Sequence, residues 1–174
     1  MEKNKESKNL EFKRLYELHS KDILLFLYRL TKNLDLAKDF LQDTFINFIK
    51  IFSGRELPDP LKCKIYLFQT AKNIFINHYR KEKKLTLLKN DFTIEEKSTN
   101  SNLTHENDEK EKVFWELVES LNYEDRTLII LRYNLDMKLE EISEIIKKSK
   151  STISRRLEKV KKKLIKIAKE KELL

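Results

Sequence analysis

Residues 139–160 read LEEISEIIKKSKSTISRRLEKV, and their pattern is typical of two helices joined by a short turn. Within residues 139–146, four apolar residues have the spacing that places them on one face of a helix: Leu139, Ile142, Ile145 and Ile146. Polar residues follow, and a longer amphipathic pattern begins at Ser151. A short helix from Leu139 to Lys147, a tight turn and a long basic helix form the layout of a helix-turn-helix, whose second helix enters the major groove of DNA.

The second helix of this motif, from Ser151 onward, is expected to read DNA. Its apolar positions alternate steps of four and three: Ile153, Leu157, Val160, Leu164 and Ile167. Ser149 or Ser151 is placed to cap the helix, which leaves backbone N–H groups free to meet a phosphate. An arginine on such a helix can bond bidentately to guanine. The side chains expected to contact DNA are Ser151, Thr152, Ser154, Arg155, Arg156 and Lys159.

A basic amphipathic helix is also compatible with a solvated surface or with a membrane surface. The helix and turn that precede it favour DNA over a merely solvated face. A membrane-surface helix usually carries Trp or Phe anchors, and this helix has neither. The turn departs from the usual motif, because Lys147-Lys148-Ser149 stands where a glycine normally supplies a left-handed residue.

The composition of the whole chain is typical of helical proteins. Among 174 residues there are one Gly and two Pro, whereas sheet proteins need both for their many turns. The net charge is +8, which favours a polyanionic partner. Basic side chains outnumber acidic ones by seven to one in residues 62–84 and by twelve to three in residues 147–174, and acidic ones predominate in between. The sequence therefore predicts an all-α chain with two separate basic segments.

The first part of the chain predicts helices of its own. Residues 10–30 contain apolar spacing for one or two helices, and residues 34–52 have six apolar residues on one clear amphipathic face. Asn33 or Asp35 can cap the start of the helix over residues 34–52.

A loop, a third helix and a linker complete the predicted organisation. Residues 53–60 hold the only Gly and both Pro of the chain, which marks a loop. A helix is expected over about residues 61–84, with Phe68 and Phe75 in the core. Residues 86–110 lose the apolar periodicity and are rich in polar and acidic side chains, so they are expected to form a flexible linker. The fold class predicted is therefore two small helical domains joined by this linker, the second containing the helix-turn-helix.

The sequence contains no recognisable catalytic or cofactor site. His19, His78 and His105 have no metal-ligand spacing with one another or with Cys63, and a single Gly cannot build a phosphate-binding loop. We therefore expect no enzymatic activity, no cofactor and no metal. Because Cys63 is alone, no internal disulfide can form, which fits a reducing, cytoplasmic setting. The longest apolar run, residues 23–28, is far shorter than the ~20 residues of a membrane span, so no membrane insertion is expected.

Three motifs in the second half carry a family resemblance: LNYEDRTLIILRY (residues 121–133), LEEISEII (residues 139–146) and STISRRL (residues 151–157). Together they resemble the fourth domain of the sigma-70 superfamily, most closely that of the extracytoplasmic-function (ECF) type. The chain keeps two of the family's residue pairs: Arg132-Tyr133 and Arg156-Leu157. It has Asn122 where the family has Pro, and Lys147-Lys148 where the family has Gly and an apolar residue.

Two motifs in the first half resemble the second domain of the same family: DLAKDFLQDTF (residues 35–45) and YLFQTAKNIFINHYR (residues 66–80). In the family the first motif binds the clamp coiled coil of the largest RNA polymerase subunit, and Asp39, Gln42 and Asp43 match its polar face. The second motif, with the loop before it, melts and reads the minus-ten promoter element. Three residues depart from it, each chemically close to the family's residue: Tyr66 for Trp, Lys72 for Arg and Asn77 for Asp.

Melted promoter DNA is single-stranded, and its binding combines cations along the backbone with pockets or flat surfaces for unstacked bases. The loop over residues 53–60 would supply the pocket, and Tyr66, His78 and Tyr79 would supply flat surfaces. For Tyr66, packing in the core is the alternative to stacking on a base. The residues expected at this DNA surface are Lys62, Lys64, Tyr66, Lys72, Asn73, Asn77, His78, Arg80 and Lys81.

The resemblance implies a sigma factor that binds RNA polymerase core and directs promoter-specific transcription initiation. Residues 10–85 would be sigma domain 2, for core binding and for recognition and melting of the minus-ten element. Residues 86–110 would be the linker, and residues 111–170 would be sigma domain 4, whose helix-turn-helix recognises the minus-thirty-five element. Promoter DNA and an anti-sigma factor are the further partners that the resemblance implies.

Two other classes of protein share parts of this pattern. A stand-alone dimeric helix-turn-helix regulator should carry a dimerisation element and has little use for a helix like residues 34–52. A purely protein-binding helical adaptor predicts no DNA binding at any salt concentration.

Overall fold

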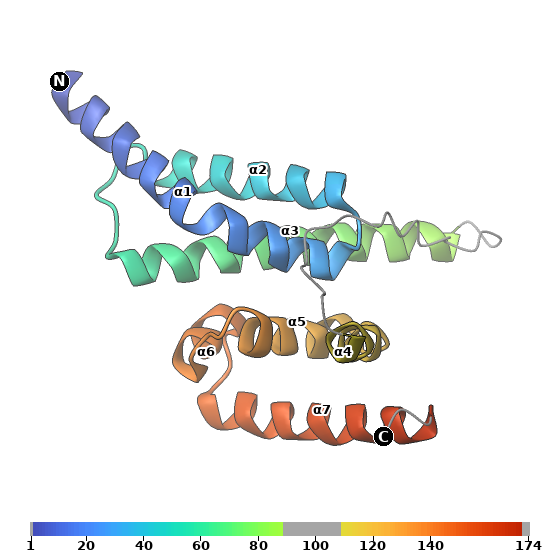
Figure 1. Ribbon diagram of the computed structural model, residues 1–174. Coiled ribbons are helices and arrows are strands. Elements are labelled where there is room, and N and C mark those ends of the chain that lie inside the picture. Colours follow the sequence, from blue (N-terminus) through green and yellow to red (C-terminus); the bar gives the residue numbers. More distant parts are fainter. Residues whose placement is uncertain (1, 89–108, 172–174) are drawn as a thin grey trace. The chain divides into compact units, whose positions relative to one another are not determined.

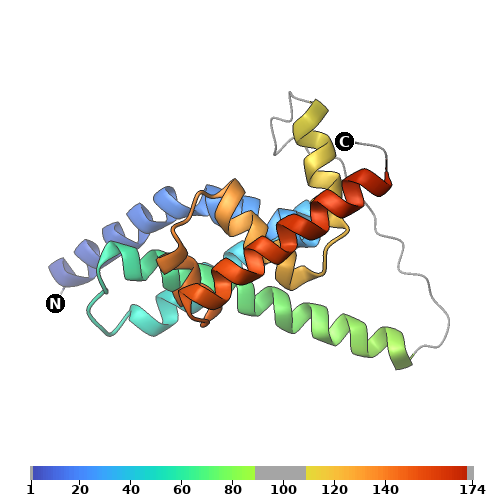
Figure 2. The same ribbon diagram turned by 90° about the horizontal axis from the view of Figure 1, so that it is seen from below.

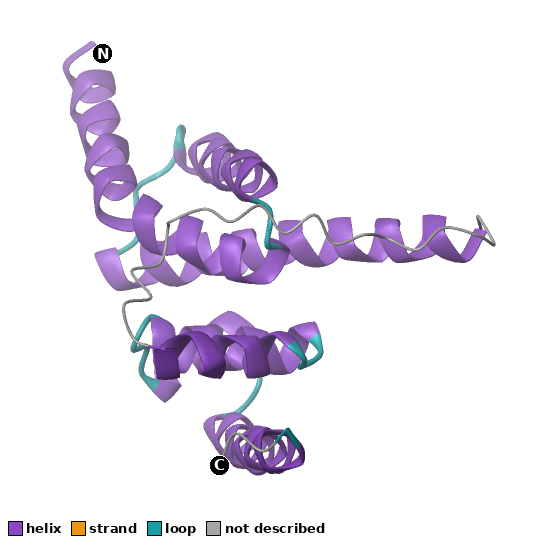
Figure 3. Cartoon of the chain, turned by 45° about the vertical axis from the view of Figure 1, so that its right-hand side comes forward, coloured by secondary structure: helices purple, strands orange, loops and turns teal. Residues whose placement is uncertain are grey.

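The computed structural model describes residues 2–88 and 109–171, which Figure 1 shows as helices joined by short loops. No strand occurs in those residues, as the colouring of Figure 3 also shows. The prediction of an all-α fold is confirmed. The chain divides into two compact units, and the division falls between Asn100 and Ser101, outside the described residues. Most of the predicted linker lies in the same undescribed stretch.

Three long helices form the first unit: α1 (Glu2–Thr31), α2 (Leu34–Phe52) and α3 (Pro60–Leu88). Each of them contacts the other two, and Figure 1 shows consecutive helices running in opposite directions. The apolar spacing of residues 10–30 therefore belongs to one helix, and α3 extends beyond the predicted range at both ends. Aromatic and aliphatic side chains make up much of the core: Ile23, Phe26 and Leu27 from α1, Phe40, Phe45 and Phe48 from α2, and Leu67, Phe68 and Phe75 from α3.

The local sequence sets the connection between α1 and α2. Lys32 takes a left-handed backbone conformation, with a φ of 54°, where α1 ends. The Asn33 side chain then accepts a hydrogen bond from the Leu36 N–H at 3.0 Å and caps α2. Asn33, rather than Asp35, is thus the capping residue. Because the connection has only two residues, α1 and α2 pack as antiparallel neighbours.

Aromatic rings join the three helices of the first unit. Phe48 of α2 is fully buried and meets the ring of Phe12 of α1 edge-on, with centroids 6.1 Å apart. It meets Tyr66 of α3 in the same manner at 5.8 Å. Phe26 of α1 and Phe68 of α3 form a further edge-on pair at 5.6 Å. Each such pair contributes about 0.5–1.5 kcal/mol to stability beyond the contribution of the area that it buries. The aromatic pairs therefore hold α1, α2 and α3 together behind the exposed faces of α2 and α3.

Five elements form the second unit: α4 (Glu109–Glu119), α5 (Tyr123–Ile129), η1 (Ile130–Asn134), α6 (Leu139–Ile146) and α7 (Lys150–Glu170). The long helix α7, red in Figure 2, contacts α4, α5 and α6. Four of the five predicted positions are buried: Ile153, Leu157, Val160 and Leu164. At the end of the helix Ala168 is buried, and Ile167, which was predicted to be buried, is half-buried. The other elements complete this core with Trp115, Leu128, Ile142 and Ile145 among others.

A π-helical turn, η1, lies between α5 and the helix-turn-helix. The Leu135 N–H donates to the Ile130 carbonyl at 3.0 Å, which is an i to i−5 hydrogen bond. Asp136 then takes a left-handed conformation with a φ of 47°, and the Met137 N–H donates to the Leu131 carbonyl at 3.0 Å. These bonds reverse the chain so that α6 begins at Leu139, as predicted.

Candidate nucleic-acid interface

The turn between α6 and α7 has helix-turn-helix geometry without a glycine. Lys147 supplies the left-handed residue, with φ 58° and ψ 47°. The Lys148 N–H donates to the Ser143 carbonyl at 3.2 Å, and the Ser143 hydroxyl donates to the Lys148 carbonyl at 2.6 Å. Ser149 follows in an extended conformation, and its hydroxyl oxygen accepts the Thr152 N–H at 3.3 Å. Ser149, rather than Ser151, is therefore the cap of α7.

The first turns of α7 separate into a buried and an exposed side. Ile153 and Leu157 face the core, whereas the side chains on the opposite side meet solvent. Ser151, Thr152, Arg155 and Lys159 are exposed, and Ser154 is half-buried. The Arg155 Nε donates to the Ser151 carbonyl of its own helix at 3.3 Å. Four of the six predicted DNA contacts thus share one accessible surface, which we call the reading face: Ser151, Thr152, Arg155 and Lys159.

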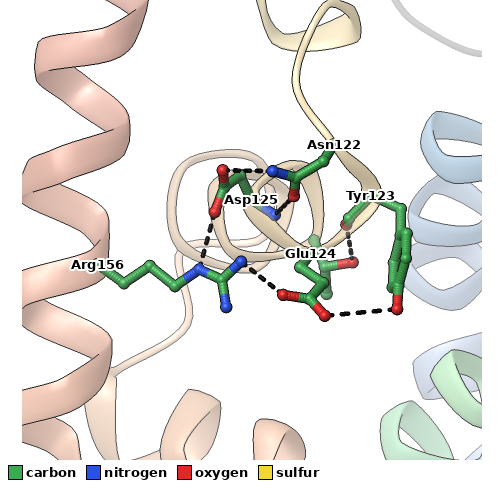
Figure 4. A network of polar contacts seen from close by, with 6 residues as sticks. Asn122, Tyr123, Glu124, Asp125 and Arg156 are labelled. Carbon is green, nitrogen blue, oxygen red and sulfur yellow. Dashed lines mark hydrogen bonds and ion pairs between the residues drawn. The ribbon is translucent and has the colours of Figure 1, made fainter.

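Arg156 is placed differently from its neighbour Arg155, because its guanidinium reaches the first turn of α5 (Figure 4). Its Nε donates to Asp125 Oδ1 at 2.8 Å, and its Nη2 donates to Glu124 Oε2 at 2.6 Å. Both acceptors belong to the first turn of α5. Burial acts to lower the pKa of Arg156, but the hydrogen bonds that its guanidinium donates to the two carboxylates outweigh this effect, so the pKa is raised. The sequence predicted Arg156 at the DNA, and the structure places its guanidinium on α5.

Further polar contacts hold the elements around the helix-turn-helix. Arg126 Nη2 donates to the Glu119 carbonyl at 2.6 Å, and so ties the start of α5 to the end of α4. Arg132 Nη1 donates to the Met137 carbonyl at 2.8 Å, in the segment that leads into α6. Thus the Arg132 of the predicted family motif closes a loop in the structure.

An ion pair joins the two helices of the motif where each of them begins. Lys150 Nζ lies 2.9 Å from Glu140 Oε1, and this hydrogen bond lowers the pKa of Glu140. Both side chains are exposed, so the pair contributes little to stability.

In the first unit, the nine residues predicted to meet melted DNA all lie on α3. Four of them are half-buried: Lys64, Tyr66, Lys72 and His78. The other five are exposed: Lys62, Asn73, Asn77, Arg80 and Lys81. Figure 3 shows the C-terminal part of α3 extending beyond α1 and α2. Arg80 and Lys81 lie in the C-terminal part of α3, and both are exposed.

The start of α3 is capped by an acidic side chain next to one of these cations. Asp59 Oδ1 accepts the Lys62 N–H at 3.0 Å, and Asp59 Oδ2 lies 3.2 Å from Lys62 Nζ. The backbone hydrogen bond from Lys62 is the largest of several causes that lower the pKa of Asp59. Lys62, one of the residues predicted to contact DNA, therefore forms an exposed ion pair with Asp59.

The aromatic residues of the predicted DNA surface have mixed surroundings. Tyr66 meets the ring edges of Phe48 and Phe52, with centroids 5.8 and 5.3 Å apart, so its ring is packed among core aromatics. His78 lies edge-on to Phe40 at 5.2 Å. Tyr79 is 41% exposed and stacks on Phe75 at 6.0 Å, which makes it the most accessible flat ring of the three.

The outer face of α2 brings together the three predicted polymerase contacts. Asp39, Gln42 and Asp43 are all exposed. Ile46 and Ile49 continue the same face and are each 40% exposed. These two isoleucines were not predicted as part of a site, although two isoleucines outside the apolar stripe of an amphipathic helix are a detectable signal in the sequence. We call these five residues the α2 face.

The described residues contain neither a candidate metal site nor a candidate membrane span. Nowhere in residues 2–88 and 109–171 do three or more His, Cys, Asp or Glu side chains gather so that they could hold a metal ion. None of the helices over these residues is long and apolar enough to cross a membrane.

Comparison with protein families identifies both units. A model of sigma-70 region 2 matches residues 15–85, and a model of sigma-70 region 4 matches residues 112–164. Residues 15–85 contain the α2 face and most of α3, and residues 112–164 contain the helix-turn-helix and the reading face. The two regions occur in the order that the sequence motifs predicted.

Individual proteins give the same result. The ECF RNA polymerase sigma factor SigM of Bacillus subtilis (strain 168) is 40% identical over 78 residues, which are 44% of this chain and 45% of SigM. The RNA polymerase sigma factor SigV of the same organism is 32% identical over 141 residues, 80% of each chain. A solved structure of the sigma factor RpoE in complex with the anti-sigma factor NepR, from Bartonella quintana, is similar in fold. Its TM-score is 0.75 at 23% identity, over 91% of this chain and 97% of that one.

Proposed function

The chain belongs to the ECF type of the sigma-70 family of RNA polymerase sigma factors, and we propose how its parts divide the work of promoter recognition. Residues 10–85 bind the polymerase core and recognise and melt the minus-ten element. Residues 111–170 bind the minus-thirty-five element, and residues 86–110 link the two. The proposal rests mainly on one observation: a helix-turn-helix with an exposed reading face occurs on the same chain as the α2 face.

The reading face supports recognition of duplex DNA in the second unit. Thr152 and Arg155 project from the first turns of α7, the part of such a helix that meets base edges. Arginine distinguishes guanine through paired hydrogen bonds in the major groove, and hydroxyls bond to bases or phosphates. Lys159 follows one turn later at a place suited to a phosphate contact. In this proposal Arg155 contributes sequence discrimination, and Lys159 contributes affinity.

The α2 face supports binding of the clamp coiled coil in the largest polymerase subunit. Protein interfaces combine an apolar centre with a polar rim. Ile46 and Ile49 would form the centre, and Asp39, Gln42 and Asp43 would form the rim. This composition fits a helical partner that carries basic side chains beside an apolar seam.

The exposed part of α3 supports contact with the melted strand. Asn73, Asn77, Arg80 and Lys81 are accessible together, and Tyr79 offers a flat surface beside them. Single-stranded DNA is bound by cations along its backbone and by aromatic rings under its bases. Tyr66, packed against two phenylalanines, is assigned a supporting role under this surface.

Several further properties follow from membership of the family. The protein acts as a subunit that lends specificity to the polymerase, which supplies the chemistry, so we assign it no catalytic activity of its own. Its place of action is the cytoplasm, where the chromosome is. Since the similar sigma factor RpoE was solved with an anti-sigma factor, we assign an anti-sigma factor to this chain as a regulatory partner.

In vitro transcription tests the proposal directly. Purified protein is added to sigma-free bacterial polymerase core with a genomic template, and the 5′ ends of the transcripts are sequenced. We expect discrete starts that share upstream and minus-ten motifs. A variant with Asp39→Arg and Asp43→Arg, which should not join the core, provides the matched negative control.

The possible outcomes separate the classes of protein. An absence of starts together with an absence of core binding would contradict the proposal and favour a dimeric regulator. An absence of DNA binding at low as well as high salt concentration would favour a protein-binding adaptor.

A further inference from the structure

Two adjacent arginines on α7 have unlike surroundings. Arg155 is exposed, and its hydrogen bond goes to Ser151 on the same helix. Arg156 spans to another helix, where its Nε and Nη2 engage Asp125 at 2.8 Å and Glu124 at 2.6 Å. A guanidinium bound by two carboxylates has fewer donors left for a base edge than one that is exposed.

The carboxylate that receives Arg156 is itself held in place (Figure 4). Asp125 is 9% exposed, and its Oδ2 accepts a hydrogen bond from Asn122 Nδ2 at 2.9 Å. In return, Asn122 Oδ1 accepts the Asp125 N–H at 2.9 Å and caps α5. Asn122 stands where the family has Pro, and a proline could not make the side-chain bond to Asp125. The Asp125 carboxylate, which accepts from Arg156, is therefore oriented by Asn122, the residue that caps α5.

Withdrawal of Arg156 toward DNA would be unfavourable. It would leave the buried Asp125 carboxylate without its cation, and a buried charge that loses its partner carries a large desolvation penalty. It would also leave the charge of Glu124 uncompensated close to the DNA phosphates. Both effects favour retention of the contact between α5 and α7 when DNA binds.

The same contact controls which side chains face outward on α7. Successive residues of an α-helix are rotated by about 100° from one another, so a small rotation of α7 about its axis would turn Thr152 and Arg155 away from the groove. Arg156 follows Arg155 directly and lies one turn after Thr152, and it donates hydrogen bonds to Asp125 and Glu124 of α5. An oriented guanidinium at that position resists rotation in a way that apolar contacts alone do not, because its hydrogen bonds are directional.

We propose that Arg156 is a positioning residue, which fixes the rotation of α7 on α5 through Asp125 and Glu124, and that Arg155 is the arginine that discriminates bases. The inference rests on the proposed function of α7 as the reading helix. It divides the two arginines by role: removal of Arg155 affects recognition at one base position, whereas release of Arg156 affects every position that α7 reads.

The test neutralises the two carboxylates and leaves both arginines in place. Holoenzyme is formed from polymerase core and full-length protein carrying Glu124→Gln with Asp125→Asn. Its affinity is measured for the promoter and for a panel with single base substitutions in the upstream element. We expect the affinity for the promoter to fall at least tenfold. We also expect the ratio of the affinity for the promoter to the affinity for each substituted site to fall at every position. Arg155→Ala should reduce that ratio at one position only.

The opposite role for Arg156 predicts the opposite sign. If Arg156 contacts DNA, neutralisation of the carboxylates frees its guanidinium and removes two negative charges, so affinity rises. A rise, or an unchanged affinity and ratio, would overturn the inference.

A third variant distinguishes a positioning role from a direct contact between Arg156 and DNA. When Arg156→Gln is added to the neutralised pair, no further loss of affinity beyond about twofold is expected, because the ion pairs of Arg156 have already been removed. An additional loss of fivefold or more would show a direct contact between Arg156 and DNA.

The failure of the proposed function would look different. A wild-type holoenzyme whose affinity ignores every substitution in the upstream element would overturn the assignment of α7 as the reading helix, and this inference with it. A base-sensitive wild type whose affinity rises on neutralisation would overturn the inference alone.

Discussion

Lys147 ends α6 in a left-handed conformation, and two residues later Ser149 caps α7 with its hydroxyl. These two residues reverse the chain between the helices of the motif, at a place where the family has a glycine after the first helix. A left-handed conformation costs a residue with a Cβ about 1–2 kcal/mol. The hydrogen bonds between Ser143 and Lys148 on either side of the turn compensate for part of this cost.

Lys147→Gly should stabilise the second unit. Glycine adopts the left-handed conformation without strain, but it also has a larger entropy in the unfolded chain, so the expected net gain is about 0.5–1 kcal/mol. The measurement is urea unfolding followed by tryptophan fluorescence, since Trp115 is the only tryptophan and is buried in this unit. Lys148→Gly is the matched control. Lys148 is not among the residues with positive φ, so glycine there should destabilise the unit.

Ser149→Ala should destabilise the second unit by about 1 kcal/mol, because it removes the side-chain cap of α7. The same fluorescence transition measures the effect. Ser151→Ala is the control, since Ser151 is exposed and the cap survives its removal; a change within about 0.5 kcal/mol is expected there. An equal loss for both variants would contradict the assignment of Ser149 as the cap.

Much of this fold could be predicted from apolar periodicity. The buried faces of α2 and α6 could be recognised from apolar residues spaced three and four apart, and these two helices have nearly the predicted bounds. The π-helical turn η1 was not predicted. Its defining bond joins Leu135 to Ile130, and no repeat in the sequence marks a single i to i−5 bond. The length of α3 was also underestimated, because exposed residues such as Leu85 and the charged side chains before it give no apolar face.

The site was harder to predict for a different reason. Arg155 and Arg156 look alike in the sequence, as two cations on one basic helix. Their difference comes from Asp125, which lies 31 residues away and meets Arg156 only once α5 and α7 have packed. The periodicity of α7 therefore identifies its buried face but not the partners at the edge of that face. By contrast, Ile46 and Ile49 could have been noticed, since they fall outside the apolar stripe of α2.

Asp39→Arg combined with Asp43→Arg should abolish binding to polymerase core and leave the fold intact. Both side chains are exposed, so little stability is at stake, whereas charge reversal at an interface repels a complementary partner. Binding is measured by co-purification with sigma-free core, and the fold by circular dichroism. The matched control is Glu11→Arg with Glu17→Arg, which makes the same change of charge on exposed positions of α1. Normal co-purification of the α2 variant would refute the proposed role of the α2 face.

The first unit should lose stability as the pH falls below about 6.5. Burial lowers the pKa of His19 below its ordinary value of 6.5, and the charge of Lys64 lowers it further, while Asp22 has a smaller opposite effect. The unfolded chain then binds a proton more readily than the folded one, so acidification below the ordinary pKa favours unfolding.

The measurement for His19 is urea unfolding of the first unit, followed by circular dichroism near pH 7.5 and near pH 5.5. His19→Gln should reduce the difference between the two midpoints, because glutamine cannot titrate. The tryptophan transition serves as the internal control, since residues 109–171 contain no histidine. A difference between midpoints that is as large in the variant as in the wild type would assign the pH dependence to other groups.

Arg80→Ala with Lys81→Ala should weaken binding of the melted strand in a salt-dependent manner. Both cations lie on the exposed extension of α3, and each phosphate contact to a single strand contributes about 0.7 to the slope of log affinity against log salt concentration. The slope for holoenzyme on a single-stranded minus-ten oligonucleotide should therefore fall by about 1.4, equally for matched and mismatched sequences, because phosphate contacts carry no base information. Lys13→Ala with Arg14→Ala on α1 removes the same charge elsewhere and should leave the slope unchanged. If the α3 variant keeps the wild-type slope, the melted strand does not run along this extension.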